Sequence, residues 1–250
     1  MQKIIITWVT KGIWRALCQK YINEWYWVIG ISSNENNLEI LRNEVSSQKL
    51  ELVKCDIWNE QDIKNFWKFL MEQKDVVSLI NNVWVGFYSN FMSHTNEKIK
   101  EIININLLWT MLLSKEVIWA IWNTVKNLTF VSSLAGKVWF DWLSVYSATK
   151  HWIEWFADAL RKELEEKWID VLIVRPWIVN TNFFVTAKME EYTRDLKSIM
   201  QSPSAVADEI FTSRKNHSME VTIWKDKWFL FLRRFVPKSL EKKLMQFFIS

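Results

Sequence analysis

The sequence predicts a single doubly wound α/β domain, in which helices cover both faces of a mostly parallel, seven-stranded sheet. The 250 residues suit one domain of this class, and half of them are apolar, so a full-sized core can be buried. Short apolar runs alternate along the chain with segments of helical periodicity. The runs are continuously apolar, which is typical of strands that are buried on both faces of a parallel sheet.

The first third of the chain predicts four strands separated by three helices. The apolar run Lys3–Thr7 ends in a loop, after which Ile13, Leu17 and Tyr21 recur on one helical face. The polar residues 32–34 separate the second run from the next helix. The expected strands are Lys3–Thr7, Trp27–Ile31, Leu50–Cys55 and Val77–Asn81, and the expected helices lie at about 13–21, 38–45 and 61–72.

Two long helices dominate the rest of the chain. Residues 99–121 form the most apolar stretch, but four charged residues interrupt it, so it is too short and too charged to span a bilayer. The expected helices are about Asn104–Ile121 and Val145–Lys167, and the expected strands are Leu128–Val131, Val171–Arg175 and Glu220–Ile223. The sequence shows no repeat or linker, so we expect one domain over residues 1–225, followed by a basic amphipathic extension over 226–250.

The composition argues against several classes of function. The net charge of +4 comes from basic residues scattered among acidic ones, so no nucleic-acid partner is expected. Cys18 and Cys55 have neither metal spacing nor a disulfide framework, and the three histidines have no metal-ligand spacing. The chain does not begin with a basic segment and a long apolar one, so no secretory signal is expected. We therefore expect a metal-free cytoplasmic protein.

Tyr146 and Lys150 have a spacing that suits proton transfer. Positions i and i+4 of a helix share a face, so the phenol and the ammonium can serve one site. A nearby cation favours the phenolate and lowers the pKa of a tyrosine, which lets the phenol donate or accept a proton near neutrality. Taken alone the pair is weak evidence, because most such pairs lie on solvated helix faces.

Further polar residues lie at the ends of the predicted strands. Ser133 follows one strand and lies 13 residues before Tyr146, Asn82 follows another, and residues 176–181 follow a third. Asn106 lies in the long helix before Ser133. Ligands of open α/β sheets bind at the carboxyl ends of the strands, so these residues are expected to form one site.

The order and spacing of these residues resemble the short-chain dehydrogenase/reductase family, from Lys3 to about Ile223. The resemblance implies a Rossmann-type fold and an NAD(P)-dependent oxidoreductase. Such an enzyme, a carbonyl reductase or alcohol dehydrogenase, transfers a hydride between the nicotinamide and a small-molecule carbonyl or alcohol substrate. A non-catalytic dinucleotide-binding regulatory or scaffold protein is the alternative.

The resemblance also implies roles for the catalytic residues. Tyr146 would be the proton donor or acceptor, and Lys150 would lower its pKa and bind the nicotinamide ribose. Ser133 would bond the substrate oxygen, and Ser132 is its neighbouring alternative, although a strand-end capping role would also explain that residue. Asn106 would hold a water molecule of the proton relay.

The cofactor loop departs from the family pattern Thr-Gly-x-x-x-Gly-Ile-Gly. Here residues 7–14 read Thr-Trp-Val-Thr-Lys-Gly-Ile-Trp, and tryptophan replaces a family glycine again at Trp84, Trp109 and Trp177. The chain holds 18 tryptophans and 4 glycines, whereas average usage predicts about 18 glycines. The cofactor-binding residues that the resemblance implies are Thr7, Trp8, Thr10, Lys11, Gly12, Ile13, Trp14, Ser32, Ser33, Asp56, Ile57, Asn82, Tyr146, Lys150, Pro176, Val179 and Thr181.

We hypothesise that most of the tryptophan positions carry glycine in the cell, as when a UGA codon is read as tryptophan in one code and glycine in another. Indoles at Trp8 and Trp14 would fill the space that the diphosphate needs. Overpacking of about 1–3 kcal/mol per site, repeated so often, would exceed the stability of a domain. Glycine would also suit the expected helix-ending turns at Trp25 and Trp168. Trp67, in an aromatic run, is expected to be genuine.

The cofactor choice can be argued from the end of the second strand. An acidic residue there would bond the ribose 2′-hydroxyl and select NAD, but this chain has Ser32 and Ser33. Lys11 could offer positive charge to a 2′-phosphate, although a solvated loop lysine is the alternative reading. NADP(H) is therefore favoured over NAD(H).

The carboxyl-terminal part bears on substrate and location. Residues 182–202 are apolar and aromatic, which favours a hydrophobic or lipid-like carbonyl substrate, although such residues also simply pack a lid. The tail around Leu240 and Leu244 forms a basic amphipathic pattern, which could lie on an anionic membrane surface, pack on its own domain or form a subunit interface. Peripheral membrane contact and a homo-oligomer are thus expectations from the sequence.

Overall fold

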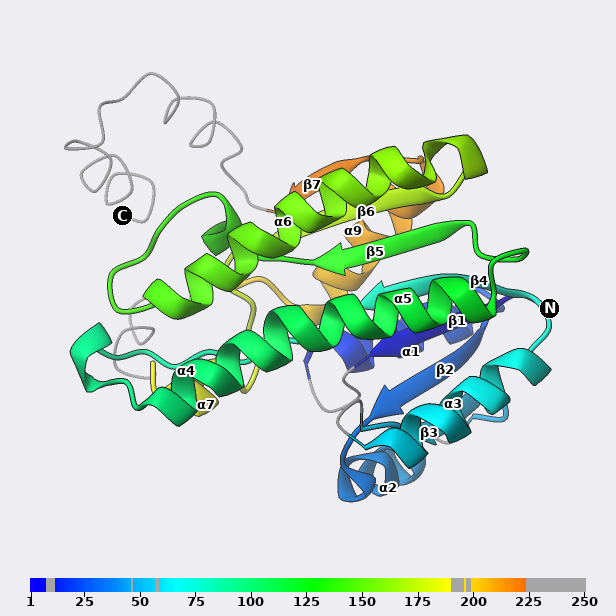
Figure 1. Ribbon diagram of the computed structural model, residues 1–250, viewed down its shortest axis with the longest axis horizontal. Helices are drawn as coiled ribbons and strands as arrows, with labels where there is room; N and C mark the ends of the chain where they lie inside the picture. The colour runs from blue at the N-terminus through cyan, green and yellow to red at the C-terminus, as the bar shows by residue number, and fades with distance from the viewer. Residues whose placement is uncertain (8–11, 46, 57–58, 190–195, 197–198, 224–250) are drawn as a thin grey trace.

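A computed structural model confirms the predicted fold class (Figure 1). It describes residues 1–7, 12–45, 47–56, 59–189, 196 and 199–223. The strands are β1 (Lys3–Thr7), β2 (Trp27–Ser32), β3 (Leu50–Lys54), β4 (Val76–Asn81), β5 (Asn127–Val131), β6 (Asp170–Pro176) and β7 (Glu220–Ile223). All seven pair in parallel, in the order β3-β2-β1-β4-β5-β6-β7. Each strand lies within a residue or two of its predicted position.

The helices form one layer on each face of the sheet (Figure 1). One layer contains α1 (Ile13–Asn23), α2 (Glu35–Glu44) and α9 (Pro203–Lys215), and the other contains α3 (Glu60–Glu72), α4 (Asn96–Ile103), α5 (Thr110–Ala120) and α6 (Ser144–Leu164). Ile4 and Ile6 of β1 pack into the core under the first layer, whereas Ile5 packs into the core under the second. All three are fully buried, which explains why the strands read as continuously apolar.

The long helix before β5 begins earlier than predicted. It starts at Asn96 with α4, continues through a π-helical segment η2 (Asn104–Trp109) and ends with α5. The expectation that this stretch is too short and too charged to cross a membrane is wrong, because the 25 residues Asn96–Ala120 are long and apolar enough by length and composition alone. Here they pack against α3, α6 and β4, which accounts for their apolar character as that of a helix covering a sheet.

The helix α9 lies outside the elements that the sequence predicted. The Ser202 side chain accepts a hydrogen bond from the Ala205 amide at 3.1 Å, and Pro203 occupies the first turn. Such an N-cap followed by proline is a helix-start signal worth about 0.5–2 kcal/mol. The helix α9 packs along α1 and completes its layer.

The strand order reverses beside β1, which pairs with β2 on one side and β4 on the other. The strands β1, β4 and β5 are neighbours and run parallel, so the loops that follow them lie together at the carboxyl-end edge of the sheet. Ligands of doubly wound folds bind at such a switch point. The fold therefore places the predicted site residues along one edge of the sheet.

The described tryptophans lie in unusual places for this side chain. Six non-glycine residues have a positive φ in the described structure, and three of them are Trp25 (68°), Trp142 (66°) and Trp168 (57°). Trp25 follows the end of α1, and Trp168 follows the turn η4 (Glu165–Lys167). Both therefore lie in helix-ending turns, as predicted. Eight tryptophans are exposed, whereas Trp14 is fully buried and its indole nitrogen has no hydrogen-bond partner among the described residues.

Candidate active site

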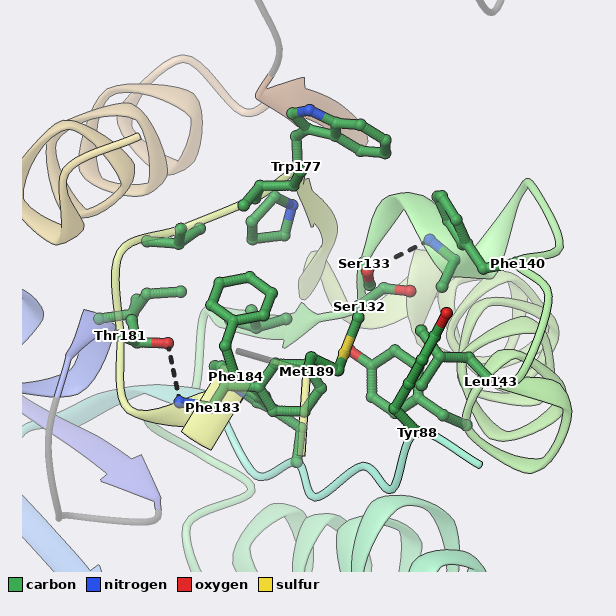
Figure 2. A pocket seen from close by; sticks show the side chains of 18 of the residues that line it. Tyr88, Ser132, Ser133, Phe140, Leu143, Trp177, Thr181, Phe183, Phe184 and Met189 are labelled. Carbon is green, nitrogen blue, oxygen red and sulfur yellow. Dashed lines mark hydrogen bonds between the residues drawn. The ribbon is translucent and has the colours of Figure 1, made fainter. Parts of the chain in front are cut away.

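An apolar pocket lies at the carboxyl ends of β5 and β6 (Figure 2). Its polar groups include Ser132 and Ser133, which follow β5, and Tyr146 on α6. Figure 2 shows Phe183 and Phe184 on one side of the pocket and Phe140 and Leu143 on the other. The arrangement surrounds a small set of hydroxyl groups with apolar side chains, which is typical of small-molecule sites. The lining residues are Ile13, Trp84, Tyr88, Val131, Ser132, Ser133, Ala135, Phe140, Asp141, Leu143, Tyr146, Pro176, Trp177, Ile178, Val179, Thr181, Phe183, Phe184 and Met189.

Tyr146 and Lys150 lie one turn apart on α6, and both side chains are buried. The Tyr146 hydroxyl forms a hydrogen bond with the Ser133 hydroxyl. The Lys150 ammonium donates to the Val131 carbonyl oxygen at 3.0 Å and lies 5.8 Å from the centre of the Tyr146 ring. The structure thus brings the predicted serine, tyrosine and lysine together at the end of β5.

The two serines after β5 have different partners. The Ser133 hydroxyl caps the short turn η3 (Leu134–Gly136) by accepting a hydrogen bond from the Ala135 amide at 3.2 Å, and it also contacts Tyr146. The Ser132 hydroxyl instead donates to Glu154 Oε1 at 3.0 Å, away from Tyr146. This geometry favours Ser133 over Ser132 as the residue that bonds a substrate oxygen.

Burial shifts the pKa values of both Tyr146 and Lys150. Burial raises the pKa of the Tyr146 hydroxyl, and the hydrogen bond with Ser133 lowers it only in part. Burial also lowers the pKa of Lys150 to about 7, while the Glu154 carboxylate raises it. In this structure the ammonium bonds the Val131 carbonyl, and burial sets the direction of the tyrosine pKa shift. The predicted lowering of the Tyr146 pKa by Lys150 therefore stays a prediction.

Asn106 lies in the π-helical segment η2 and is buried. Its amide nitrogen donates to the Val85 carbonyl at 2.9 Å and to the Thr149 hydroxyl at 3.0 Å, and its Oδ1 accepts from the Val85 amide at 2.7 Å. The side chain therefore fixes the chain after β4 against α6. Its predicted role with a water molecule stays a prediction.

The predicted cofactor residues at the end of β1 are placed in part. The Thr7 hydroxyl accepts a hydrogen bond from the Asn82 amide at 3.0 Å, which joins the ends of β1 and β4. Gly12 has a φ of 77°, and a Cβ there would lie 2.6 Å from Cγ2 of Thr181. This close approach across the switch point needs a residue without a side chain, and it fits a loop that admits a dinucleotide. Trp8, Thr10, Lys11 and Ile57 lie outside the described residues.

Trp14 does not occupy the expected position. Its indole is buried in the core under α1, together with Leu17 and Ile4, and it does not line the pocket, whereas its neighbour Ile13 does. The prediction that the Trp14 indole fills the diphosphate space is therefore wrong, because the indole lies in the core. The reason is that the first turn of α1 directs position 14 toward the sheet, where a family glycine would serve helix–strand packing.

The remaining predicted cofactor residues also lie along this edge. Ser32 ends β2 and accepts a hydrogen bond from the Asn34 amide at 3.2 Å, and Ser33 follows it. The Asp56 amide donates to Asp62 at the start of α3. Three further residues, Pro176, Val179 and Thr181, line the pocket.

A family model described as short chain dehydrogenase matches residues 2–191. The chain belongs to the short-chain dehydrogenase family. It is therefore an NAD(P)-dependent oxidoreductase, and the resemblance inferred from its motifs is confirmed.

One relative and two solved structures illustrate the range of the family. "Putative steroid dehydrogenase 4" of Caenorhabditis elegans is 29% identical over 189 residues, which cover 71% of this chain and 72% of the relative. A short-chain dehydrogenase from Sphingobium yanoikuyae in complex with NADPH is similar with a TM-score of 0.80 and 18% identity, covering 98% of this chain and 95% of that one. A 3-ketoacyl-(acyl-carrier-protein) reductase from Brucella melitensis complexed with NADH has a TM-score of 0.79 and 18% identity, covering 89% and 96%.

Sequence reasoning missed two features of this short-chain dehydrogenase. Gly86, after β4, lies so close to the pocket that a Cβ there would come within 2.7 Å of the Phe183 ring. Glu154 and Arg175 form a buried ion pair at 2.8 Å directly behind Ser132. The chain has only four glycines, so the presence of one after β4 was a signal for the close approach at Gly86. Glu154, four residues after Lys150 on the same helix face, was a signal for the second.

Proposed function

We propose that the chain is a carbonyl reductase or alcohol dehydrogenase that uses NADP(H) on a hydrophobic carbonyl or alcohol substrate. The observation that carries this proposal is the meeting of Ser133 and Tyr146 at the wall of an apolar pocket, with the buried Lys150 one helical turn from Tyr146. The alternative of a non-catalytic dinucleotide-binding protein is not favoured, because a binding protein needs no hydrogen-bonded serine–tyrosine pair beside a buried ammonium.

The hydroxyl groups of Ser133 and Tyr146 would bind the substrate oxygen. A carbonyl oxygen placed between them accepts hydrogen bonds from both, which polarises the carbonyl group. The phenol of Tyr146 then supplies the proton that turns this oxygen into a hydroxyl. The Ser133 hydroxyl stabilises the negative charge that develops on the oxygen before the proton arrives. A bound nicotinamide dinucleotide supplies or accepts the hydride.

Lys150 would serve the same step through its charge. The ammonium lies under the Tyr146 ring, and a positive charge there stabilises the phenolate that remains after proton donation. Gly12 and Thr181, which approach each other closely across the switch point, would lie beside the bound dinucleotide at the N-terminus of α1. Asn106 keeps the segment after β4 in place beside this site.

The pocket favours a substrate with an apolar body. Phe183 lies 4.6 Å from Trp84, 5.5 Å from Tyr146 and 5.5 Å from Phe184, measured between ring centres. Met189 packs on the same cluster and contributes a flexible apolar wall. Each Å² of apolar substrate surface buried here is worth about 25 cal/mol. An aliphatic or aromatic ketone therefore gains more from this wall than a small polar one.

A panel of carbonyl compounds tests this proposal. NADPH oxidation should be fastest with ketones that carry a long alkyl or aromatic body and slow with small hydroxy-ketones. The Phe183→Ala variant should lose roughly tenfold or more in kcat/KM for apolar ketones and much less for small ones. Phe69→Ala, on α3 and away from the pocket, is the matched control. A panel on which no compound supports NADPH oxidation would contradict the proposal.

The cofactor preference also remains a proposal. The residue that ends β2 is Ser32, whose hydroxyl bonds the Asn34 amide, and no carboxylate follows before Glu35 on α2. A ribose 2′-phosphate would meet no negative charge from this described segment, which supports NADP(H). Membrane contact through the tail, which lies outside the described residues, and assembly into a homo-oligomer stay predictions.

We further propose that most tryptophan positions carry glycine in the protein as the cell makes it. Trp25, Trp142 and Trp168 have the positive φ that glycine adopts freely and that costs other residues about 1–2 kcal/mol. Trp14 buries an indole N–H without a described partner, which costs about 1–3 kcal/mol. Trp67 differs, because it lies mid-helix in α3. Both costs disappear if glycine occupies these positions.

A further inference from the structure

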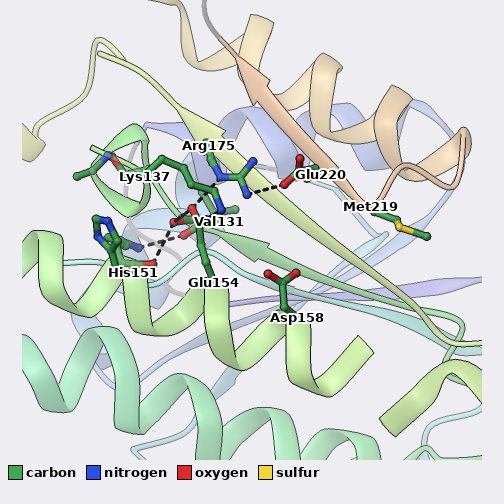
Figure 3. A network of polar contacts seen from close by, with 12 residues as sticks. Val131, Lys137, His151, Glu154, Asp158, Arg175, Met219 and Glu220 are labelled. Carbon is green, nitrogen blue, oxygen red and sulfur yellow. Dashed lines mark hydrogen bonds and ion pairs between the residues drawn. The ribbon is translucent and has the colours of Figure 1, made fainter. Parts of the chain in front are cut away.

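A buried charge network lies behind the site and links the segments that carry it (Figure 3). Glu154, on α6, is 1% exposed and accepts hydrogen bonds at Oε1 from the Ser132 hydroxyl (3.0 Å) and Arg175 Nε (2.8 Å). Its Oε2 forms an ion pair with Lys137 Nζ at 3.0 Å. Arg175, on β6, also pairs with Glu220 of β7 at 2.7 Å.

The partners of Glu154 adjoin residues of the pocket. Ser132 precedes Ser133, and Arg175 precedes Pro176, which lines the pocket. Gly136, in the turn η3, leaves room for this contact, because a Cβ there would lie 2.5 Å from the Ser132 hydroxyl and even closer to Glu154. One carboxylate therefore joins the ends of β5 and β6 to the helix that carries Tyr146 and Lys150.

The charges in this network also act on Lys150. The charged and titratable groups around Glu154 and Lys150 include Tyr146 and His151 on α6, Lys137 after η3, Arg175 on β6 and Glu220 on β7. A buried ammonium loses hydration and tends to release its proton, and a nearby carboxylate opposes that loss. Lys137 and Arg175 partly neutralise the carboxylate and so weaken its effect on Lys150.

We propose that Glu154 is a positioning residue of the active site. It anchors the Ser132-Ser133 segment through the Ser132 hydroxyl, and its negative charge favours the protonated form of the Lys150 side chain. The two cations, Lys137 and Arg175, set how much of that charge reaches Lys150. The role of Lys150 in turnover rests on the proposed function, whereas its titration in the free protein does not.

The titration of Lys150 tests the proposal in the full chain without a dinucleotide. The lysine ¹³Cε signals of ¹³C-labelled protein are followed against pH, and the Lys150 signal is the one that disappears in Lys150→Met. Glu154→Gln should move its midpoint to lower pH by about one unit or more, because the opposing carboxylate is gone. Lys137→Met should move it to higher pH, because Glu154 is then less neutralised. The Lys137 side chain is 40% exposed, so this variant remains informative if Glu154→Gln does not fold.

Asp158→Asn is the matched control, since it makes the same charge change one turn further along α6 at an exposed carboxylate that pairs with Arg161. It should leave the Lys150 midpoint unchanged. Glu154→Asp retains the charge and should restore the midpoint toward that of the parent protein. A midpoint that stays fixed in Lys137→Met, or that moves equally in Asp158→Asn, would overturn the proposal.

The free protein offers a second readout with a definite sign. Because the pKa of Lys150 is about 7 in the folded chain against 10.5 for a free lysine, the unfolded chain binds more protons between these values. The free energy of unfolding should therefore rise with pH across this window. Lys150→Met should remove that rise, and Glu154→Gln should extend it to lower pH. A failure of the enzyme assay alone would refute the proposed function and leave this titration result standing.

Discussion

Replacing Tyr146 by phenylalanine is expected to lower kcat/KM for carbonyl reduction by about 10²- to 10⁴-fold, the usual contribution of a positioned general acid. The change removes only the hydroxyl that bonds Ser133, and the ring can still pack against Phe183 at 5.5 Å. Initial rates of NADPH oxidation with an apolar ketone, measured on both proteins, give the ratio. Binding of the dinucleotide should change little, because the ring stays in place.

The control for this variant is Tyr26→Phe. The Tyr26 hydroxyl accepts a hydrogen bond from Arg214 at 3.3 Å beside α9 and does not line the pocket. Its loss should leave the rate within about twofold of the parent protein. If Tyr146→Phe keeps more than a tenth of the parent rate, the tyrosine is not the proton donor and the mechanism fails.

Glycine at positions 8, 14, 84 and 177 together is expected to raise the affinity for NADPH by about a hundredfold or more. This gain corresponds to about 3 kcal/mol of steric cost that the indoles would impose on the bound dinucleotide, since each 1.4 kcal/mol is about tenfold in affinity. Trp84 and Trp177 line the pocket, and Trp14 lies at the packing of α1 on the sheet. Calorimetric titration of NADPH, and separately of NADH, into both chains measures the gain and the cofactor preference together.

Trp67→Gly is the control for the glycine variant. Trp67 lies mid-helix in α3, 4.9 Å from the ring of Trp119 and away from the pocket. Glycine there should give no gain in NADPH affinity and should lower the free energy of unfolding by about 1 kcal/mol or more. If Trp14→Gly alone lowers that free energy by about 3–5 kcal/mol, as for a genuine buried aromatic residue, the tryptophan belongs in the core and the glycine proposal is wrong.

The sheet could be predicted from the sequence because its central strands contribute side chains to the cores on both faces. Ile5 faces one helix layer and Ile4 and Ile6 the other, so the run has no polar gaps and cannot be confused with an exposed strand. The spacing of Ser133, Tyr146 and Lys150 placed the candidate site for the same reason, since strand ends and one helix face converge at the switch point. Local patterns were sufficient for both.

The charge network could not be predicted, because its partners are distant in sequence. Glu154 lies 22 residues from Ser132 and 21 from Arg175, and each of these residues alone reads as a polar position on a helix or at a strand end. The raised pKa of Tyr146 was missed for a related reason. The i,i+4 spacing gives proximity to Lys150, but only the structure shows that the ammonium bonds Val131 while the phenol is buried.

Transfer of deuterium from NADPH that carries deuterium at both C4 positions of the nicotinamide tests the central claim most directly. The chain with glycine at positions 8, 14, 84 and 177 is incubated with labelled NADPH and an apolar ketone, and the product is analysed by mass spectrometry. We expect an alcohol with deuterium on the carbinol carbon from the chain that retains Tyr146, and almost none from the same chain with Tyr146→Phe. NADPH consumption that leaves the product unlabelled, or no alcohol from any ketone, would contradict this claim.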